Sequence, residues 1–199
     1  MPELQRTDER PAPGDRVASR QGAVLSVHRS ADHSFSKSAH ASIRLVAGLG
    51  VESDAHLGAR VQHRSRVAQD PSQPNLRQVH LLPSELFDEL ASDGFIVGPG
   101  ELGENITTRD LELRLLPAGS MLRIGDEALV ALTGLRNPCK QIETYRDGLL
   151  KAVLDRDASG AVIRKAGVMG VVVLGGEVKP GDSIEVAFPP APHRPLERI

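Results

Sequence analysis

The stretch that decides the fold class reads Met121-Leu122-Arg123-Ile124-Gly125-Asp126-Glu127-Ala128-Leu129-Val130-Ala131-Leu132. Gly125-Asp126 separates two short runs of strand-forming residues, and both Gly and Asp tolerate the positive φ that tight hairpins require. Met121 to Ile124 and Ala128 to Leu132 are therefore predicted to be neighbouring antiparallel strands.

Strand signals of the same kind lie on both sides of this hairpin. Lys179-Pro180-Gly181-Asp182 places Pro and Gly at the central positions of a type II turn, which leads into the last strand. The other predicted strands are Ala23 to Val27, Ile43 to Ala47, Arg77 to Leu82, Leu111 to Leu115, Val162 to Lys165, Val168 to Leu174 and Ser183 to Val186.

Two segments have the helical spacing of apolar residues. Ser84 can cap a helix that ends at Gly94, and a second helix is expected from Arg146 or Asp147 to Arg156. The two helices do not alternate with the many short strands. This pattern favours a mainly β fold, a small β-barrel with a few short helices, over a βαβ sheet.

The 199 residues are enough for one domain with loose ends. Residues 1–21 and 188–199 contain several prolines and no periodic apolar set, so a flexible N-terminal arm and a flexible C-terminal tail are expected around a folded unit over 22–187. Residues 54–76 are charged and aperiodic, and they are predicted to be a long loop of the kind that is often functional.

Composition excludes several classes of protein. A net charge of -2 gives no overall attraction to nucleic acid or to an anionic membrane, and no apolar run approaches the ~20 residues of a membrane span. The single cysteine excludes an intramolecular disulfide, and no apolar leader precedes the folded unit. A cytoplasmic protein is therefore expected.

Cys139 is the first candidate for chemistry. It follows a predicted strand, and the cations Arg136 and Lys140 on either side would stabilise its thiolate, which is the form that binds metal or carries sulfur. Pro138 restricts the backbone directly before it. The alternative is an inert buried cysteine, because Cys is among the most buried residue types.

The long loop carries a basic cluster of Arg60, His63, Arg64 and Arg66. The paired donors of guanidinium groups can hold a phosphate, and the alternative is a solvated surface.

The run Gly98-Pro99-Gly100-Glu101-Leu102-Gly103 matches the spacing of a dinucleotide fingerprint. A β-favouring run follows it instead of a helix, and its acidic residues would repel phosphate. It is better interpreted as a turn that presents Glu104 and Asn105 to a heterocycle such as a pterin, or that uses them to tie the loop together.

A cysteine hydrolase could in principle be assembled from Cys139, His80 and Asp54. The sequence contains no oxyanion-hole signature that would support this class. The same holds for a histidine metal site, because Asp54, His56, His63 and His80 are ligand types without a tight ligand spacing.

Several blocks taken together resemble the MOSC domain, the family named after the C-terminal part of molybdenum-cofactor sulfurases. They occur in the family's order and cover most of the folded unit, although Ser53 stands where a glycine is usual. The blocks are Asp54-Ala55-His56-Leu57-Gly58, Gly100-Glu101-Leu102-Gly103-Glu104-Asn105-Ile106-Thr107, Leu116-Pro117-Ala118-Gly119-Ser120-Met121-Leu122-Arg123-Ile124-Gly125, Arg136-Asn137-Pro138-Cys139 and Gly181-Asp182-Ser183-Ile184.

The resemblance implies a MOSC-type β-barrel in which Cys139 binds the molybdenum of a pterin cofactor or carries sulfur. No pyridoxal phosphate is expected, because the chain has no room for the aminotransferase-like module of larger relatives. Taken with the charge argument, the resemblance gives these candidate cofactor-binding residues: Asp54, His56, Arg60, Arg64, Arg66, Glu104, Asn105, Arg136, Asn137 and Lys140.

Two functions from different classes follow from this resemblance. The chain is either a molybdenum-cofactor-binding component that reduces N-hydroxylated compounds with a partner reductase, or a non-enzymatic carrier of sulfur or pterin. In the second case a cysteine desulfurase would be a natural partner.

Overall fold

The hairpin at residues 121–132 forms as predicted. β7 (Met121–Ile124) pairs antiparallel with β8 (Ala128–Leu135), and Ile124 lies opposite Ala128. Gly125 has a φ of 58°, the left-handed conformation for which the turn needs glycine. The computed structural model describes residues 20–199, except for the side chains of Arg64 and Ser65.

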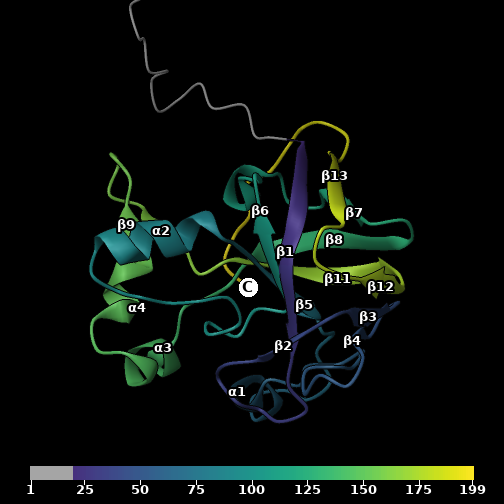
Figure 1. Ribbon diagram of the computed structural model, residues 1–199, viewed down its shortest axis with the longest axis horizontal. Helices are drawn as coiled ribbons and strands as arrows, with labels where there is room; N and C mark the ends of the chain where they lie inside the picture. The colour runs from purple at the N-terminus through teal and green to yellow at the C-terminus, as the bar shows by residue number, and fades with distance from the viewer. Residues whose placement is uncertain (1–19) are drawn as a thin grey trace, which may run out of the picture.

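Within the described residues, seven strands close into a barrel in the order β13-β7-β8-β11-β5-β6-β1 (Figure 1). The barrel closes because β13 pairs with β1 as well as with β7, and all neighbours are antiparallel except β5 and β6. The predicted fold class is therefore confirmed. The remaining barrel strands are β1 (Gln21–Arg29), β5 (Val79–Pro83), β6 (Ile106–Arg109), β11 (Val168–Leu174) and β13 (Ser183–Ala187).

Smaller pairings extend the barrel. β2 (Ser38–His40) continues the large sheet from β1. A three-stranded sheet has the order β12-β3-β4, and a separate hairpin joins β9 to β10. Their bounds are β3 (Ile43–Val46), β4 (Gly50–Val51), β9 (Leu154–Arg156), β10 (Val162–Arg164) and β12 (Gly176–Val178).

The apolar residues form two separate cores. Along β8 every second residue is buried, and these residues fill the barrel together with those of its neighbours, such as Leu122 and Ile124. Outside the barrel, α2 (Glu85–Ser92), α3 (Lys140–Tyr145) and α4 (Leu149–Ala152) contribute to a second cluster that includes Leu90, Ile142 and Leu149. Figure 1 shows these helices together on one side of the barrel.

Two predicted elements are wrong. Residues 111–115 were expected to form a strand, but Leu113–Leu115 is a 3-10 helix, η1, that follows a turn in which Asp110 has a φ of 59°. The helix expected from Arg146 or Asp147 to Arg156 is much shorter, because only Leu149–Ala152 is helical, as α4. Gly148, with a φ of 79°, separates α3 from α4, and the chain then enters β9.

The structure describes the C-terminal segment in full and the N-terminal arm only at its end. The predicted arm over 1–21 lies outside the described residues apart from its last two, of which Gln21 begins β1. Residues 188–199, expected to be a flexible tail, pack along β8: Leu196 is buried, and the Leu135 amide donates to the Glu197 carbonyl over 2.7 Å. The prolines exclude regular structure there without preventing this docking.

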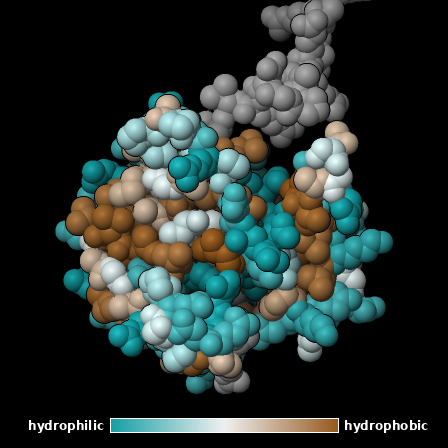
Figure 2. Space-filling view, turned by 180° about the vertical axis from the view of Figure 1, so that it is seen from behind, coloured by the Kyte–Doolittle hydropathy of each residue, from teal (hydrophilic) through white to brown (hydrophobic). Residues whose placement is uncertain are grey.

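Apolar side chains are exposed on the rear face of the molecule (Figure 2). Seen from behind, apolar side chains gather over the barrel (Figure 2), and Val173 and Leu174 on β11 are among the exposed ones. Among the described residues, no helix is long and apolar enough to span a membrane.

Candidate functional site

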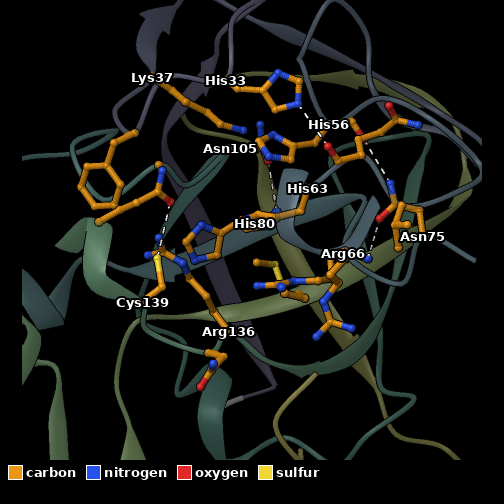
Figure 3. A pocket seen from close by; sticks show the side chains of 18 of the residues that line it. His33, Lys37, His56, His63, Arg66, Asn75, His80, Asn105, Arg136 and Cys139 are labelled. Carbon is orange, nitrogen blue, oxygen red and sulfur yellow. Dashed lines mark hydrogen bonds between the residues drawn. The ribbon is translucent and has the colours of Figure 1, made fainter. Parts of the chain in front are cut away.

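A pocket of about 520 Å³ lies where the loop after β1, the long loop at 54–76 and the segment after β8 meet (Figure 3). Its charged lining comes from Lys37, Arg66, Arg77 and Arg136, and no Asp or Glu of the described chain lines it. The volume is in the range of small-molecule sites, which is about 300 to 1,000 Å³. Such a lining favours an anionic ligand.

Cys139 lines this pocket and is partly exposed. It lies in extended conformation directly before α3, and its thiol donates a long hydrogen bond of 3.5 Å to the Gln141 side-chain oxygen. A negative charge on Cys139 would raise the pKa of both Arg77 and Arg136, so these two guanidinium groups are the cations that a thiolate there would meet.

Arg136 is the most unusual residue of the pocket. It is 9% exposed, and its Nη1 atom has no hydrogen-bond partner among the described residues. Its guanidinium carbon lies 5.8 Å from the centre of the Phe35 ring. Burial lowers the pKa of Arg136, while Cys139 and Glu104 oppose that shift. A buried guanidinium with a free donor is costly to leave unpaired, which indicates a ligand.

The other cations strengthen the positive field. Burial lowers the pKa of Arg77 to about 10, and the charges of Arg66 and Arg136 act in the same direction. Burial also lowers the pKa of His63 to about 4, helped by Arg77. His63 is therefore neutral at pH 7, and the arginines supply the charge.

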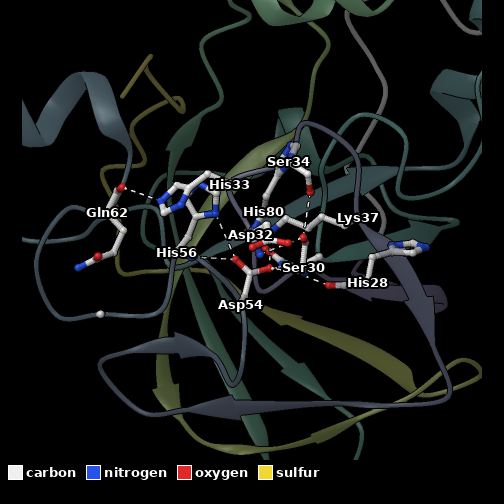
Figure 4. A network of polar contacts seen from close by, with 12 residues as sticks. His28, Ser30, Asp32, His33, Ser34, Lys37, Asp54, His56, Gln62 and His80 are labelled. Carbon is white, nitrogen blue, oxygen red and sulfur yellow. Dashed lines mark hydrogen bonds and ion pairs between the residues drawn. The ribbon is translucent and has the colours of Figure 1, made fainter.

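Asp54 lies behind one wall of the pocket and forms hydrogen bonds with residues of that wall (Figure 4). Its buried carboxylate accepts hydrogen bonds from Lys37 Nζ at 2.7 Å, Asn105 Nδ2 at 3.0 Å and the His56 backbone amide at 3.0 Å. Burial would raise the pKa of Asp54, but the contacts with His56 and Lys37 outweigh it and hold that pKa below its usual range. Asp54 is thus a charged anchor for pocket residues.

His56 is oriented by the same carboxylate. Its Nδ1 lies 3.1 Å from Asp54 Oδ1, and its ring lies at the pocket beside His33, with ring centres 5.3 Å apart. When Nδ1 donates to Asp54, the Nε2 atom is left as the acceptor.

His80 and Cys139 do not form a hydrolase triad with Asp54. His80 Nε2 lies 2.8 Å from the Ala166 carbonyl, and burial holds the pKa of His80 well below its usual value. The Asp54 carboxylate contacts His56 and Lys37 instead of His80. The arrangement lacks both the oriented base and its link to the thiol.

The structure brings many of the sequence candidates to this pocket. His56, Arg66, Asn105, Arg136, Asn137 and Cys139 line it, and Asp54 lies directly behind. Glu104 is buried outside the lining, where Oε1 accepts bonds from the Gly100 amide and the Thr107 hydroxyl.

Two further candidates do not line the pocket, and the side chain of a third lies outside the described part of the chain. Arg60 is exposed, and Lys140 lines a different hollow that is bounded by α3, α4 and the β9–β10 hairpin. Arg64 begins α1 (Arg64–Val67), but its side chain lies outside the described part of the chain. Neighbouring positions on a helix point in different directions, so proximity to Cys139 in sequence did not predict the direction of Lys140.

Sequence reasoning missed Lys37 and Arg77, and it weighed His80 only for a hydrolase triad and for a histidine metal site. Lys37 lies in a loop without a motif, and Arg77 looked like the first residue of a strand. An isolated Arg beside a run of buried strand residues is a usable signal, because such a charge needs a partner or a ligand.

Comparisons with known proteins agree with the fold. The family model described as MOSC domain matches residues 52–185, which is more than half of the chain. No curated protein matches the chain. Among solved structures, the YUAD protein from Bacillus subtilis is similar with a TM-score of 0.71 and 23% identity, over 87% of this chain and 100% of that one.

Two further structures are similar at lower TM-scores. YiiM from Geobacillus stearothermophilus has a TM-score of 0.59 and 19% identity, over 83% of this chain and 75% of that one. YiiM from Escherichia coli has a TM-score of 0.57 and 18% identity, over 86% of this chain and 72% of that one. At these identities the likeness shows the fold.

Proposed function

The chain belongs to the MOSC domain family, and from this premise we propose that its pocket binds the molybdenum cofactor, with the Cys139 thiolate on the metal. Arg66, Arg77 and Arg136 would hold the phosphate group of the pterin. With a partner reductase, the loaded protein would reduce N-hydroxylated compounds.

The buried Arg136, whose Nη1 donor has no hydrogen-bond partner among the described residues, is the observation that carries this proposal. Arg136 is 9% exposed, has this free Nη1 donor and lies near the chain's single thiol. Such a buried cation adds little to the stability of the fold and is well suited to bind an anion. The site thus offers a soft donor for the metal and hard donors for phosphate oxygens.

The residues present also fit the cofactor by size and charge. The pocket volume of about 520 Å³ suits a small heterocyclic ligand, and the described lining contributes no carboxylate that would repel a phosphate. When bound, the cofactor would supply two-electron redox chemistry at molybdenum.

His56 would handle the protons that such a reduction consumes. Cleavage of an N–O bond with two electrons takes up two protons and releases water. The contact between His56 Nδ1 and Asp54 at 3.1 Å fixes the ring, so that Nε2 can hold a proton at the pocket.

A second candidate is a carrier that holds sulfur on Cys139 as a persulfide. The partial exposure of Cys139 favours it, because a donor protein must reach the sulfur atom. The persulfide is an anion near neutral pH, and Arg77 and Arg136 would stabilise it as they would a thiolate.

Metal and sulfur analysis test both candidates on the same pair of proteins. Wild type and Cys139→Ser are purified from cells that make the cofactor, and molybdenum and pterin are measured. In parallel, mass spectrometry follows sulfur on Cys139 after treatment with a cysteine desulfurase and L-cysteine. We expect molybdenum or added sulfur in the wild type and neither in Cys139→Ser, whose fold should be intact.

A double substitution of pocket arginines tests the binding of the phosphate group separately from the binding of the metal. Arg66→Ala with Arg77→Ala should lower the retained pterin by at least about tenfold, because charge-assisted bonds to phosphate contribute about 1.5 to 3 kcal/mol each. Arg194→Ala with Arg198→Ala, exposed and away from the pocket, is the matched control.

If the wild-type protein carries neither molybdenum nor added sulfur in the first experiment, the proposal fails.

A further inference from the structure

A second hollow, of about 870 Å³, lies on the helical side of the molecule. Its lining comes from α3, α4 and the β9–β10 hairpin, and it mixes apolar and charged side chains. Its lining includes Lys140, Glu143, Leu150, Lys151, Asp155, Arg156 and Val162.

The hollow adjoins the pocket at the start of α3. Cys139 and Gln141 line the pocket, whereas Lys140 between them lines the hollow. The hollow therefore begins at the residue that follows Cys139, so an extended segment bound along it would have one end near the thiol-bearing segment.

Two carboxylates, Glu143 and Asp155, line the hollow, and Asp155 Oδ1 accepts a hydrogen bond from the Arg156 amide at 2.7 Å. The Glu143 carboxylate accepts bonds from the Gly148 amide at 3.1 Å and the Leu150 amide at 3.1 Å.

Within the described residues, neither Lys140 nor Lys151 has an ion pair or a side-chain hydrogen bond, and both are exposed. Since Lys140, Lys151 and Arg156 outnumber the two carboxylates, the hollow has a net positive charge.

Apolar surface accompanies these lysines. Val162 is 38% exposed, and Leu150 is partly buried against the second core. An occupant with carboxylates for the lysines and an aliphatic side chain for this surface would fit it.

We propose that this hollow is the docking groove for an extended, acidic segment of a partner protein that delivers sulfur to Cys139. The inference rests on the sulfur-carrying form of the proposed function. The Cys139 thiolate attacks the outer sulfur of the partner's persulfide, forming an S–S bond on Cys139. The partner's S–S bond breaks with its electron pair and leaves a thiolate, so the transfer is redox-neutral and needs no further reactant.

The single cysteine makes a direct test simple, since every thiol reaction reports on Cys139. The probe is a short peptide of Asp and Leu residues around one cysteine, activated as a mixed disulfide with thiopyridine. Attack by Cys139 joins the peptide to the protein and releases pyridine thione, whose absorbance gives the rate. Neutral dipyridyl disulfide reports access to the thiol alone.

The decisive comparison uses Lys151→Glu with Arg156→Glu, which leaves Lys140 beside the thiol unchanged. We expect the acidic peptide to react about tenfold more slowly with this variant than with wild type, because charge reversal removes the electrostatic attraction. Dipyridyl disulfide should react equally with both. A peptide with Lys in place of Asp should react faster with the variant than with wild type.

Arg194→Glu with Arg198→Glu changes the net charge equally, away from the hollow, and should leave the peptide rates unchanged. Lys151→Glu alone should give part of the effect. Equal rates of the acidic peptide with wild type and variant, at equal rates of the neutral disulfide, would overturn the groove while leaving cofactor binding intact. A thiol inert to the neutral disulfide would overturn both the groove and the reactive role of Cys139.

Discussion

Ser53 adopts a backbone conformation that a non-glycine residue rarely takes. Its φ is 60°, in the turn that ends with the Asp54 amide donating to the Val51 carbonyl over 3.1 Å. The turn that the family usually builds with glycine is thus kept with serine, and it delivers Asp54 to the pocket wall. The left-handed conformation costs a non-glycine residue about 1 to 2 kcal/mol.

Ser53→Gly should therefore stabilise the protein. Glycine takes this φ without the Cβ clash, although it makes the unfolded chain more flexible, so we expect a net gain of about 0.5 to 1 kcal/mol. Urea unfolding measures the change. Gly160→Ser, at a φ of 84° in an open hairpin, is the inverse control and should destabilise. A loss of stability in Ser53→Gly would show that the serine side chain itself holds the turn.

We expect the buried charge of Arg136 to lower the free energy of unfolding and to contribute to the binding of an anion. Replacing a buried charge by an apolar side chain of similar length is often neutral or stabilising by about 1 to 4 kcal/mol. We expect Arg136→Met to unfold at equal or higher urea concentration than wild type. Inorganic phosphate should raise the melting temperature of the wild type and not that of the variant, because only the wild type binds it.

The exposed Arg194→Met is the control and should keep the response to phosphate. A variant at Arg136 that loses more than about 2 kcal/mol would mean that the guanidinium is fully paired in the fold.

Among the elements, those with a clear apolar pattern could be predicted from the sequence. β7 and β11 have the predicted bounds, and α2 begins after Ser84 as expected. The strands of two or three residues, such as β4 and β12, carry too few side chains to show a period, and pairing with distant segments is what forms them.

The same limits apply to the prediction of the pocket residues. Cys139, Arg136 and Asn105 could be found because motif and charge lie together in sequence. Arg77 and Lys37 reach the pocket through strand pairing and loop closure, which local spacing does not encode.

The C-terminal segment depends on one glycine of β8. A Cβ on Gly134 would lie 2.6 Å from the Glu197 carbonyl oxygen and 2.6 Å from Ile199 Cγ2. Because the nearest atom belongs to backbone, the segment itself would have to move.

Gly134→Ala should displace this segment and cost about 1 to 3 kcal/mol of folding free energy. The Ile199 amide, which donates to the Leu135 carbonyl over 3.2 Å, should exchange its hydrogen faster in the variant. Gly98→Ala is the control, since a Cβ there would meet only Glu101 at 3.9 Å. Unchanged exchange at Ile199 in Gly134→Ala would contradict the docking.

On the scale of the whole molecule, the pocket lies where two cores meet. The barrel core and the helical cluster share no residue, and Phe35, which packs against the helical cluster, also contacts Arg136. The thiol is on the segment that leaves the barrel through β8 and enters α3. A barrel closed by β1 and β13 thus gives a rigid wall, and the helical side brings the thiol to it.

Buried histidines make the stability of the whole molecule depend on pH. Burial lowers the pKa of His28 to about 4, with Lys37 and His40 adding to the shift, and burial also holds the pKa of His80 well below its usual value. In the unfolded chain a histidine has a pKa of about 6.5. The unfolded state therefore binds more protons as the pH falls below about 6.5, and stability decreases towards pH 4.

Glu104 acts in the opposite direction, because burial raises its pKa and the folded state takes up its proton first as the pH falls. Asp54, with its lowered pKa, adds a loss of stability only below about pH 4, where carboxylates of the unfolded chain become protonated. The decrease between pH 6.5 and 4 thus reports on the histidines.

His28→Leu should flatten this decrease. The His28 ring is buried and neither of its nitrogens has a hydrogen-bond partner among the described residues, so the substitution removes a titrating group without removing a bond. Urea unfolding at several pH values from 7 to 4 should show a slope that is smaller by up to about 1.4 kcal/mol per pH unit, the contribution of one proton. An equally steep decrease in variant and wild type would mean that His28 is protonated in the folded protein, and that its environment stabilises the imidazolium.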